Sequence, residues 1–89
     1  MRSTWDPIKA ETNEQKHGIS FDEAATVFGD PLAGTFPDIE HSIGEMRLIT
    51  VGLSAMGRLL VVAHTDGEDI IRIISARPAT SHERKAYES

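Results

Sequence analysis

The sequence predicts an α+β protein with a small antiparallel sheet of three to four strands, two helices before it and one after it. Two helix openings come early in the chain, three apolar segments follow closely in the second half, and a third helix opening precedes the C-terminus. The 89 residues include no cysteine, and 39% are hydrophobic. This length and composition fit one domain over residues 1–89, without disulfides or thiolate metal sites.

The first 18 residues predict a short edge strand at Ser3–Trp5 and a helix from about Pro7 to His17. Asp6 suits the N-cap and the proline suits the first helical position, while Gly18 suits the helix end. The clearest stripe on this helix is polar and consists of Lys9, Asn13, Lys16 and His17.

The second helix is expected to follow Ser20, because Ser20 and Glu23 have the spacing of a capping box. Its apolar residues recur at helical spacing and predict packing on a core: Phe21, Ala24, Ala25 and Phe28. The run Gly29-Asp30-Pro31 is expected to end it.

The second half predicts a hairpin sheet. A short strand at Leu32–Phe36 and a polar loop at 37–45 are followed by strands at Met46–Leu53, Arg58–Thr65 and Ile70–Arg77. The last strand carries isoleucines at both parities, which indicates a central strand covered on both faces. A capping box at Thr80-Ser-His-Glu83 opens the final helix, which is expected to end near Tyr87.

Simple hairpin pairing predicts which side chains share a face. A four-residue first turn places Arg47 opposite His64, and a turn at Asp66-Gly67 places Arg58 and Arg77 on one face of the sheet. Arg72 falls on the other face. A one-residue bulge would exchange these faces. Both faces are too apolar for water, so we expect the helices on one and the last helix, a second copy or a partner on the other.

Charge is distributed unevenly around the net value of −5. Residues 1–46 hold nine acidic and three basic residues, whereas residues 47–89 hold five acidic and six basic ones. The overall acidity argues against non-specific duplex binding but allows a local arginine cluster to bind one nucleic-acid segment. No apolar run has the length of a secretion signal or membrane span, so we expect a cytoplasmic protein.

Several motifs resemble the BrnT family over nearly the whole chain. The first half contributes Trp5-Asp6-Pro7, Lys16-His17-Gly18 and Phe28-Gly-Asp-Pro31. The second half contributes Arg47 before Val51-Gly52, Gly57-Arg58, Arg72-Ile-Ile-Ser-Ala-Arg77 and Glu83-Arg84-Lys85 with Tyr87. The paired KHG and RIISAR motifs are the most specific part of this resemblance.

The resemblance implies a RelE-like fold and a ribonuclease toxin of a bacterial type II toxin–antitoxin system that halts translation in a stress response. It implies a BrnA-type antitoxin, assembly as a homodimer or a heterotetramer with that antitoxin, and contact with operator DNA only through the antitoxin. RelE-like ribonucleases are usually basic, and this chain departs from them by its net charge of −5. The alternative function is a non-catalytic antitoxin-binding module that acts as a co-repressor.

RNA cleavage without metal or cofactor needs a proton-transfer group and cations at the phosphate, which directs attention to histidine and arginine. The predicted catalytic residues are His17, Arg47 and Arg77, and the predicted substrate-binding residues are Lys16, Arg58 and Arg72.

Each of these residues has a structural alternative. His17 and Lys16 suit a helix C-terminus, and an arginine suits an ion pair, for example Arg77 or Arg72 with Glu83 or Glu45. Asp38, Glu40, His41 and Glu45 match no metal motif and are predicted to lie in a solvated loop.

Overall fold

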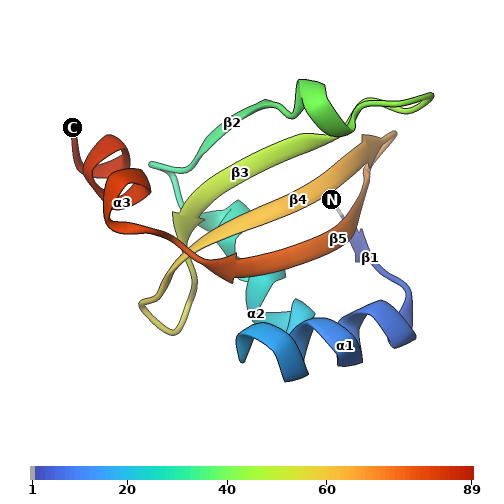
Figure 1. Ribbon diagram of the computed structural model, residues 1–89, viewed down its shortest axis with the longest axis horizontal. Helices are drawn as coiled ribbons and strands as arrows, with labels where there is room; N and C mark the ends of the chain where they lie inside the picture. Colours follow the sequence, from blue (N-terminus) through green and yellow to red (C-terminus); the bar gives the residue numbers. More distant parts are fainter. Residues whose placement is uncertain (1) are drawn as a thin grey trace.

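The computed structural model describes residues 2–89 and confirms the α+β class. Five strands form one sheet in the order β1-β5-β4-β3-β2 (Figure 1). The strands are β1 (Arg2–Thr4), β2 (Gly34–Pro37), β3 (Leu48–Leu53), β4 (Leu59–Gly67) and β5 (Ile70–Pro78). The α-helices are α1 (Pro7–His17), α2 (Phe21–Ala25) and α3 (Ser81–Glu88), and the short 3-10 helices are η1 (Thr26–Gly29) and η2 (Ile39–His41).

The sheet differs from the prediction of three to four antiparallel strands. It has five strands, and it is mixed because β1 pairs in parallel with β5. The N-terminal strand β1 pairs with β5 at one edge of the sheet. The chain then crosses through α1 and α2 and enters the sheet again at the opposite edge, as β2 (Figure 1). None of the helices in residues 2–89 is long and apolar enough to cross a membrane.

The first helix begins and ends as predicted. Asp6 caps α1 by accepting a hydrogen bond from the Ile8 amide (2.8 Å), and Gly18 ends it in the left-handed conformation, at φ 71°. Asn13 is the residue of α1 that is buried. Its amide donates to the carbonyls of Ile19 and Ala76 and accepts from the Ala76 N–H, so it replaces a neighbouring strand at the edge of β5.

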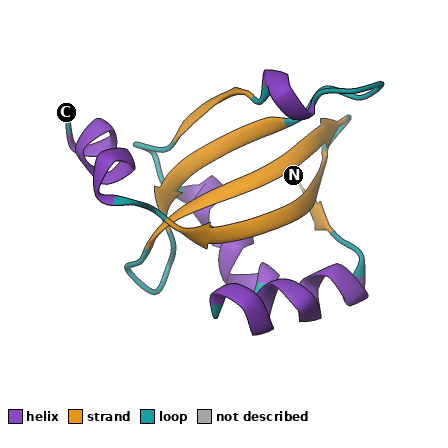
Figure 2. Cartoon of the chain, viewed as in Figure 1, coloured by secondary structure: helices purple, strands orange, loops and turns teal. Residues whose placement is uncertain are grey.

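The predicted second helix is divided into α2 and η1. Thr26 accounts for the division, since its hydroxyl donates to the Glu23 carbonyl (2.6 Å) and accepts from the Ala55 amide (2.8 Å). The core lies between these helices and one face of the sheet, where α1 and α2 both lie (Figure 2). Its buried members are Ile19, Phe21, Ala24, Val27, Leu60, Val62, Ile71, Ile73 and Ala76.

Strand β3 lies so close to η1 that only glycine fits at position 52. A Cβ atom at Gly52 would lie 2.8 Å from the Ala33 Cβ and 2.9 Å from Val27 Cγ1. The close approach brings η1 against the core and fixes the face of β3 that points toward the helices.

The strand register corrects two predictions about side-chain position. The first turn is one residue longer than predicted, so Leu48, and not Arg47, lies opposite His64. His64 is buried on the helix side, where its ring bonds Thr50 and Asp66 and packs edge-on against Phe28. It is therefore not a neighbour of the Arg47 side chain in a surface site.

A bulge in β5 corrects the predicted arginine faces. Ala63 pairs with Ser75 and His64 pairs with Ile73, so Ile74 is the extra residue. The second turn also lies two residues later than predicted, after β4 has continued to Gly67. The bulge reverses the side-chain alternation of the end of β5, so Arg58 and Arg77 do not share a face.

Candidate functional site

The face of the sheet opposite α1 and α2, which we call the outer face, carries two predicted arginines on β5. Thr65 pairs with Arg72 and Val61 pairs with Arg77, and odd positions of β4 point away from the core. The Arg72 guanidinium donates from Nη2 to Glu45 Oε1 (2.7 Å) and from Nε to Thr65 Oγ1 (3.4 Å). The side chains of this ion pair are 50% and 59% exposed.

Arg47 reaches the same end of the outer face from the loop before β3. It directly precedes Leu48, which lies opposite His64, so strand alternation places it beside Thr65 and on the outer side. Arg47 is partly buried, and it forms no ion pair with any other residue in 2–89. The structure therefore brings Arg47 and Arg72 to opposite sides of one β4 residue.

Residues 38–47 form a closed loop, which we call the site loop. The Asp38 amide donates to the Arg47 carbonyl (2.8 Å), so the two ends of the loop are joined. The Ser42 hydroxyl donates to the Asp38 carbonyl (2.7 Å) and accepts from the Arg47 amide (2.9 Å). These bonds hold the backbone that carries His41, Glu45 and Arg47.

The site loop holds an ordered imidazole–carboxylate pair. His41 Nδ1 lies 2.8 Å from Asp38 Oδ2, and the imidazole is 62% exposed. The sequence predicts a solvated loop for both residues and no role in catalysis. The i, i+3 spacing becomes informative only once the 3-10 turn η2 folds the histidine back toward the carboxylate.

Arg77 lies at the other end of the outer face and bonds Glu83 of α3 through two hydrogen bonds of 2.8 Å. Glu83 also accepts from the Thr80 amide (2.8 Å) and thereby completes the predicted capping box. The pKa of Glu83 is lowered from 4.5 to about 2, and the hydrogen bonds from Arg77 are the largest cause. Arg77 therefore fixes α3 on the sheet in this structure.

A hollow of about 490 Å³ lies between α3 and the outer face of β2 and β3. Gly34, Phe36 and Val51 line its sheet side, and His82, Ala86 and Tyr87 line its helix side. The Tyr87 hydroxyl closes one end by donating to Asp30 Oδ2 (2.6 Å).

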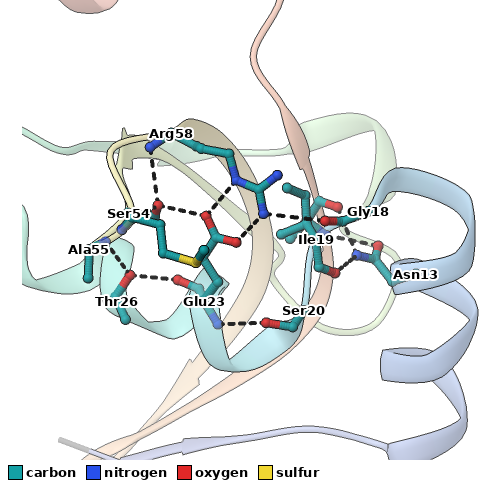
Figure 3. A network of polar contacts seen from close by, with 11 residues as sticks. Asn13, Gly18, Ile19, Ser20, Glu23, Thr26, Ser54, Ala55 and Arg58 are labelled. Carbon is teal, nitrogen blue, oxygen red and sulfur yellow. Dashed lines mark hydrogen bonds and ion pairs between the residues drawn. The ribbon is translucent and has the colours of Figure 1, made fainter.

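Arg58 lies apart from the outer face and bonds the carboxylate of Glu23 (Figure 3). Glu23 is only 4% exposed and also accepts from the Ser54 hydroxyl (2.7 Å). The hydrogen bonds from Arg58 lower the pKa of Glu23, against the opposing effect of burial. Glu23 thus does not complete the predicted capping box with Ser20, although Ser20 Oγ accepts from the Glu23 amide (3.1 Å).

Lys16 and His17 occupy a third location, at the end of α1. With Lys9 they line a hollow of about 270 Å³ between α1 and the bulged part of β5 at Ile74 and Ser75. The six predicted site residues therefore lie in three places, and their roles stay predictions. No group of three or more histidine, aspartate or glutamate side chains within residues 2–89 is arranged to hold a metal ion.

Comparison with known proteins finds similarity in both sequence and structure. Residues 5–83 match the family described as the ribonuclease toxin BrnT of type II toxin–antitoxin systems. The structure is similar to the 1.1 Å crystal structure of the Brucella abortus ribonuclease toxin BrnT, with a TM-score of 0.70 and 26% identity over 91% of this chain and 99% of that one. A search of curated proteins found no match. The RelE-like classification stays a prediction.

Proposed function

Because this chain belongs to the BrnT family of ribonuclease toxins of type II toxin–antitoxin systems, we propose that it cleaves RNA without a metal ion on the outer face of its sheet. Cleavage there would inhibit translation in the cytoplasm. The observation that carries this proposal is that Arg72 lies beside Thr65 on the outer face, while strand alternation puts Arg47 on the other side of the same residue. Arg77 lies on the same face and suits a neighbouring phosphate.

The chemistry needs cations at the point where negative charge develops. When a ribose 2′-oxygen attacks the adjacent phosphorus, the crowded phosphate gains charge on its free oxygens. Guanidinium groups suit this position because they donate two parallel hydrogen bonds to a phosphate. A sheet holds them more firmly than a mobile loop, so less binding energy is lost in ordering them.

Phosphate can replace the carboxylate that Arg72 meets in the free protein. Both partners of the Arg72–Glu45 pair are at least half exposed, and exposed pairs contribute only about 0–1 kcal/mol to stability. The buried Glu23 makes the Arg58 pair different, because removing Arg58 would leave a charge inside the protein. This contrast supports Arg72 as a substrate ligand more strongly than Arg58.

The hollow beside Lys16 and His17 supplies a second predicted contact with the substrate. Lys9 and Lys16 lie on the same side of α1, seven positions and about 10 Å apart along the helix. Two cations at this spacing suit two phosphates of one strand.

The antitoxin is proposed to be of the BrnA type and to bind the apolar surface around the hollow beside α3. Leu32 and Phe36 line this hollow and are exposed, and β2 is an edge strand of the sheet. An unpaired edge with apolar side chains beside it suits a partner segment that adds a strand or packs a helix. Assembly as a heterotetramer, with operator DNA bound through the antitoxin, follows from the family relationship as part of the same proposal.

Growth arrest on expression tests the nuclease proposal. The unaltered protein should arrest growth and degrade RNA, and co-expression of the antitoxin should relieve the arrest. Arg72→Ala should reduce cleavage by about 100-fold, the usual loss on removing one positioned donor to a transition state. Arg84→Ala is the matched control, because Arg84 is an exposed arginine of α3 away from Thr65 and the site loop.

The co-repressor alternative predicts a different outcome. A folded protein that leaves growth and RNA unchanged, yet strengthens operator binding by the antitoxin, would overturn the nuclease proposal and support the binding module. Equal cleavage by Arg72→Ala and Arg84→Ala would instead move the site away from the outer face.

A further inference from the structure

We infer that His41 is the general acid of the proposed cleavage reaction and that Asp38 is its positioning residue. This inference rests on the proposed ribonuclease function. His41 Nδ1 is bonded to Asp38 Oδ2 at 2.8 Å, and the ring is 62% exposed, so its Nε2 side is open to a substrate. A histidine oriented by a carboxylate through one ring nitrogen transfers protons from the other.

Asp38 is itself held in place, so the orientation of the imidazole does not depend on a mobile chain. Its side chain is 16% exposed, and its backbone N–H and C=O are bonded to Arg47 and Ser42 at 2.8 and 2.7 Å. His41 ends the 3-10 turn η2, and its own amide donates to the Asp38 carbonyl (3.3 Å). Backbone and side chain thus both tie the histidine to Asp38.

The site loop connects His41, along the chain, to residues at the cations of the outer face. Arg47 ends this loop, and Glu45 within it bonds Arg72 of β5 at 2.7 Å. A phosphate held by Arg47 and Arg72 would therefore contact both the end of this loop and the strand to which the loop is bonded. The same ten residues supply an acid, a carboxylate and one phosphate ligand.

The other histidines are placed less well for this role. His64 is buried, and both of its ring nitrogens are bonded, to Thr50 and to Asp66. His17 lies at the end of α1, in the hollow against the edge of β5. His82 lies on α3 at the far end of the outer face.

The reaction balances with the side chains of the site loop. The ribose O2′ attacks phosphorus while its proton passes to the Glu45 carboxylate, which leaves Arg72 free for the phosphate. The P–O5′ bond breaks, and O5′ takes the proton from Nε2 of the His41 imidazolium. The products are a 2′,3′-cyclic phosphate and a 5′-hydroxyl end, and both side chains return to their starting state by exchanging protons with water.

A leaving-group experiment tests this assignment directly. His41→Gln should slow cleavage of ordinary RNA by 100-fold or more, the usual contribution of general acid–base catalysis. A substrate with bridging 5′-sulfur at the cleaved bond needs no acid, because a thiolate leaves unprotonated. On that substrate His41→Gln should cleave as fast as the unaltered protein, while RNA affinity stays unchanged on both.

Two further variants test whether Asp38 acts by orienting His41 or only by supporting the fold. Asp38→Asn should slow ordinary RNA cleavage and regain full rate on the 5′-sulfur substrate, as expected of a residue that acts through His41. His82→Gln, the matched histidine control, should leave both rates unchanged. Folding of each variant is checked by its circular dichroism and thermal transition.

The outcomes distinguish this inference from the function on which it rests. If the unaltered protein cleaves and Arg72→Ala does not, but His41→Gln cleaves ordinary RNA at the full rate, only the His41 assignment is overturned. A His41→Gln variant that stays slow on the 5′-sulfur substrate also overturns it. If the unaltered protein cleaves no RNA, both proposals fail together.

Discussion

The burial of its carboxylate partner distinguishes an arginine with a structural role from one that is proposed to bind substrate. Arg58 and Arg72 are similarly exposed, at 46% and 50%, but Glu23 is 4% exposed and Glu45 is 59% exposed. Losing Arg58 leaves the charged Glu23 carboxylate unpaired in the interior, whereas losing Arg72 leaves the Glu45 carboxylate in contact with water. The sequence alone presents both as arginines beside β-branched runs and does not separate them.

Arg58→Ala is therefore expected to lower the urea midpoint of unfolding, because it leaves the Glu23 carboxylate, which is only 4% exposed, without its cation. The variant also loses the bond from Arg58 to the Gly18 carbonyl (3.3 Å), which ties the end of α1 to the same network (Figure 3). Urea unfolding measures the change, with Arg84→Ala as the control near zero. A stable Arg58→Ala protein with weakened RNA binding would contradict this reading and support the predicted substrate contact.

Local sequence signals predicted single residues well where the partner is near in the chain. The caps at Asp6 and Thr80 and the stop at Gly18 are confirmed, because each depends on residues within one helical turn. Glu23 shows the limit of such signals. Its capping-box spacing to Ser20 is real, but Arg58, 35 residues away, competes for the carboxylate and binds it.

At the scale of elements, one bulge decides which arginines share a face. The sequence showed both strands and the possibility of a bulge, but nothing in β5 marks Ile74 as the extra residue. The bulge places Arg77 beside Val61 on the outer face together with Arg72, and it turns Arg77 away from Arg58. The candidate site therefore depends on a register detail that the side-chain pattern leaves open.

The last helix depends on one carboxylate that has two functions. Glu83 caps α3 and also holds Arg77, and these bonds lower its pKa from 4.5 to about 2. A lowered folded-state pKa contributes stability above the unfolded value, and this contribution is lost as the pH falls from about 4.5 toward 2. We expect α3 to detach from the sheet in this range while the core stays folded.

Hydrogen exchange of the α3 amides measures this detachment. Glu83→Gln should detach α3 at all pH values. Loss of the ion pair with Arg77 and of part of the α3 cap should lower the stability by about 1 kcal/mol. Glu88→Gln, another acidic position of α3 and exposed, is the control. Equal acid profiles for Glu83→Gln and the unaltered protein would show that another group controls the attachment of α3.

At the scale of the whole molecule, a net charge of −5 has to coexist with the proposed binding to a polyanion. The fold pairs part of the acidic charge with arginines and places another part on the far side of α1. Glu11 and Glu14 lie on the opposite side of α1 from Lys9 and Lys16, by helical spacing. The outer face has Arg47, whereas its two carboxylates, Glu45 and Glu83, are already paired with arginines.

This arrangement predicts a shallow salt dependence of RNA binding. Each phosphate neutralised on a single strand contributes about 0.7 to the slope of log affinity against log salt, so contacts from Arg47, Arg72 and Arg77 give about 2 for an RNA too short to reach the Lys9–Lys16 hollow. Arg77→Gln should lower the slope by about 0.7, while Arg84→Gln should leave it unchanged, because only the former removes a phosphate contact. Fluorescence anisotropy with a short single-stranded RNA at several salt concentrations measures both. An equal slope for the two variants would exclude Arg77 from the RNA interface, and a steeper slope for the unaltered protein would require the Lys9–Lys16 hollow as a further contact.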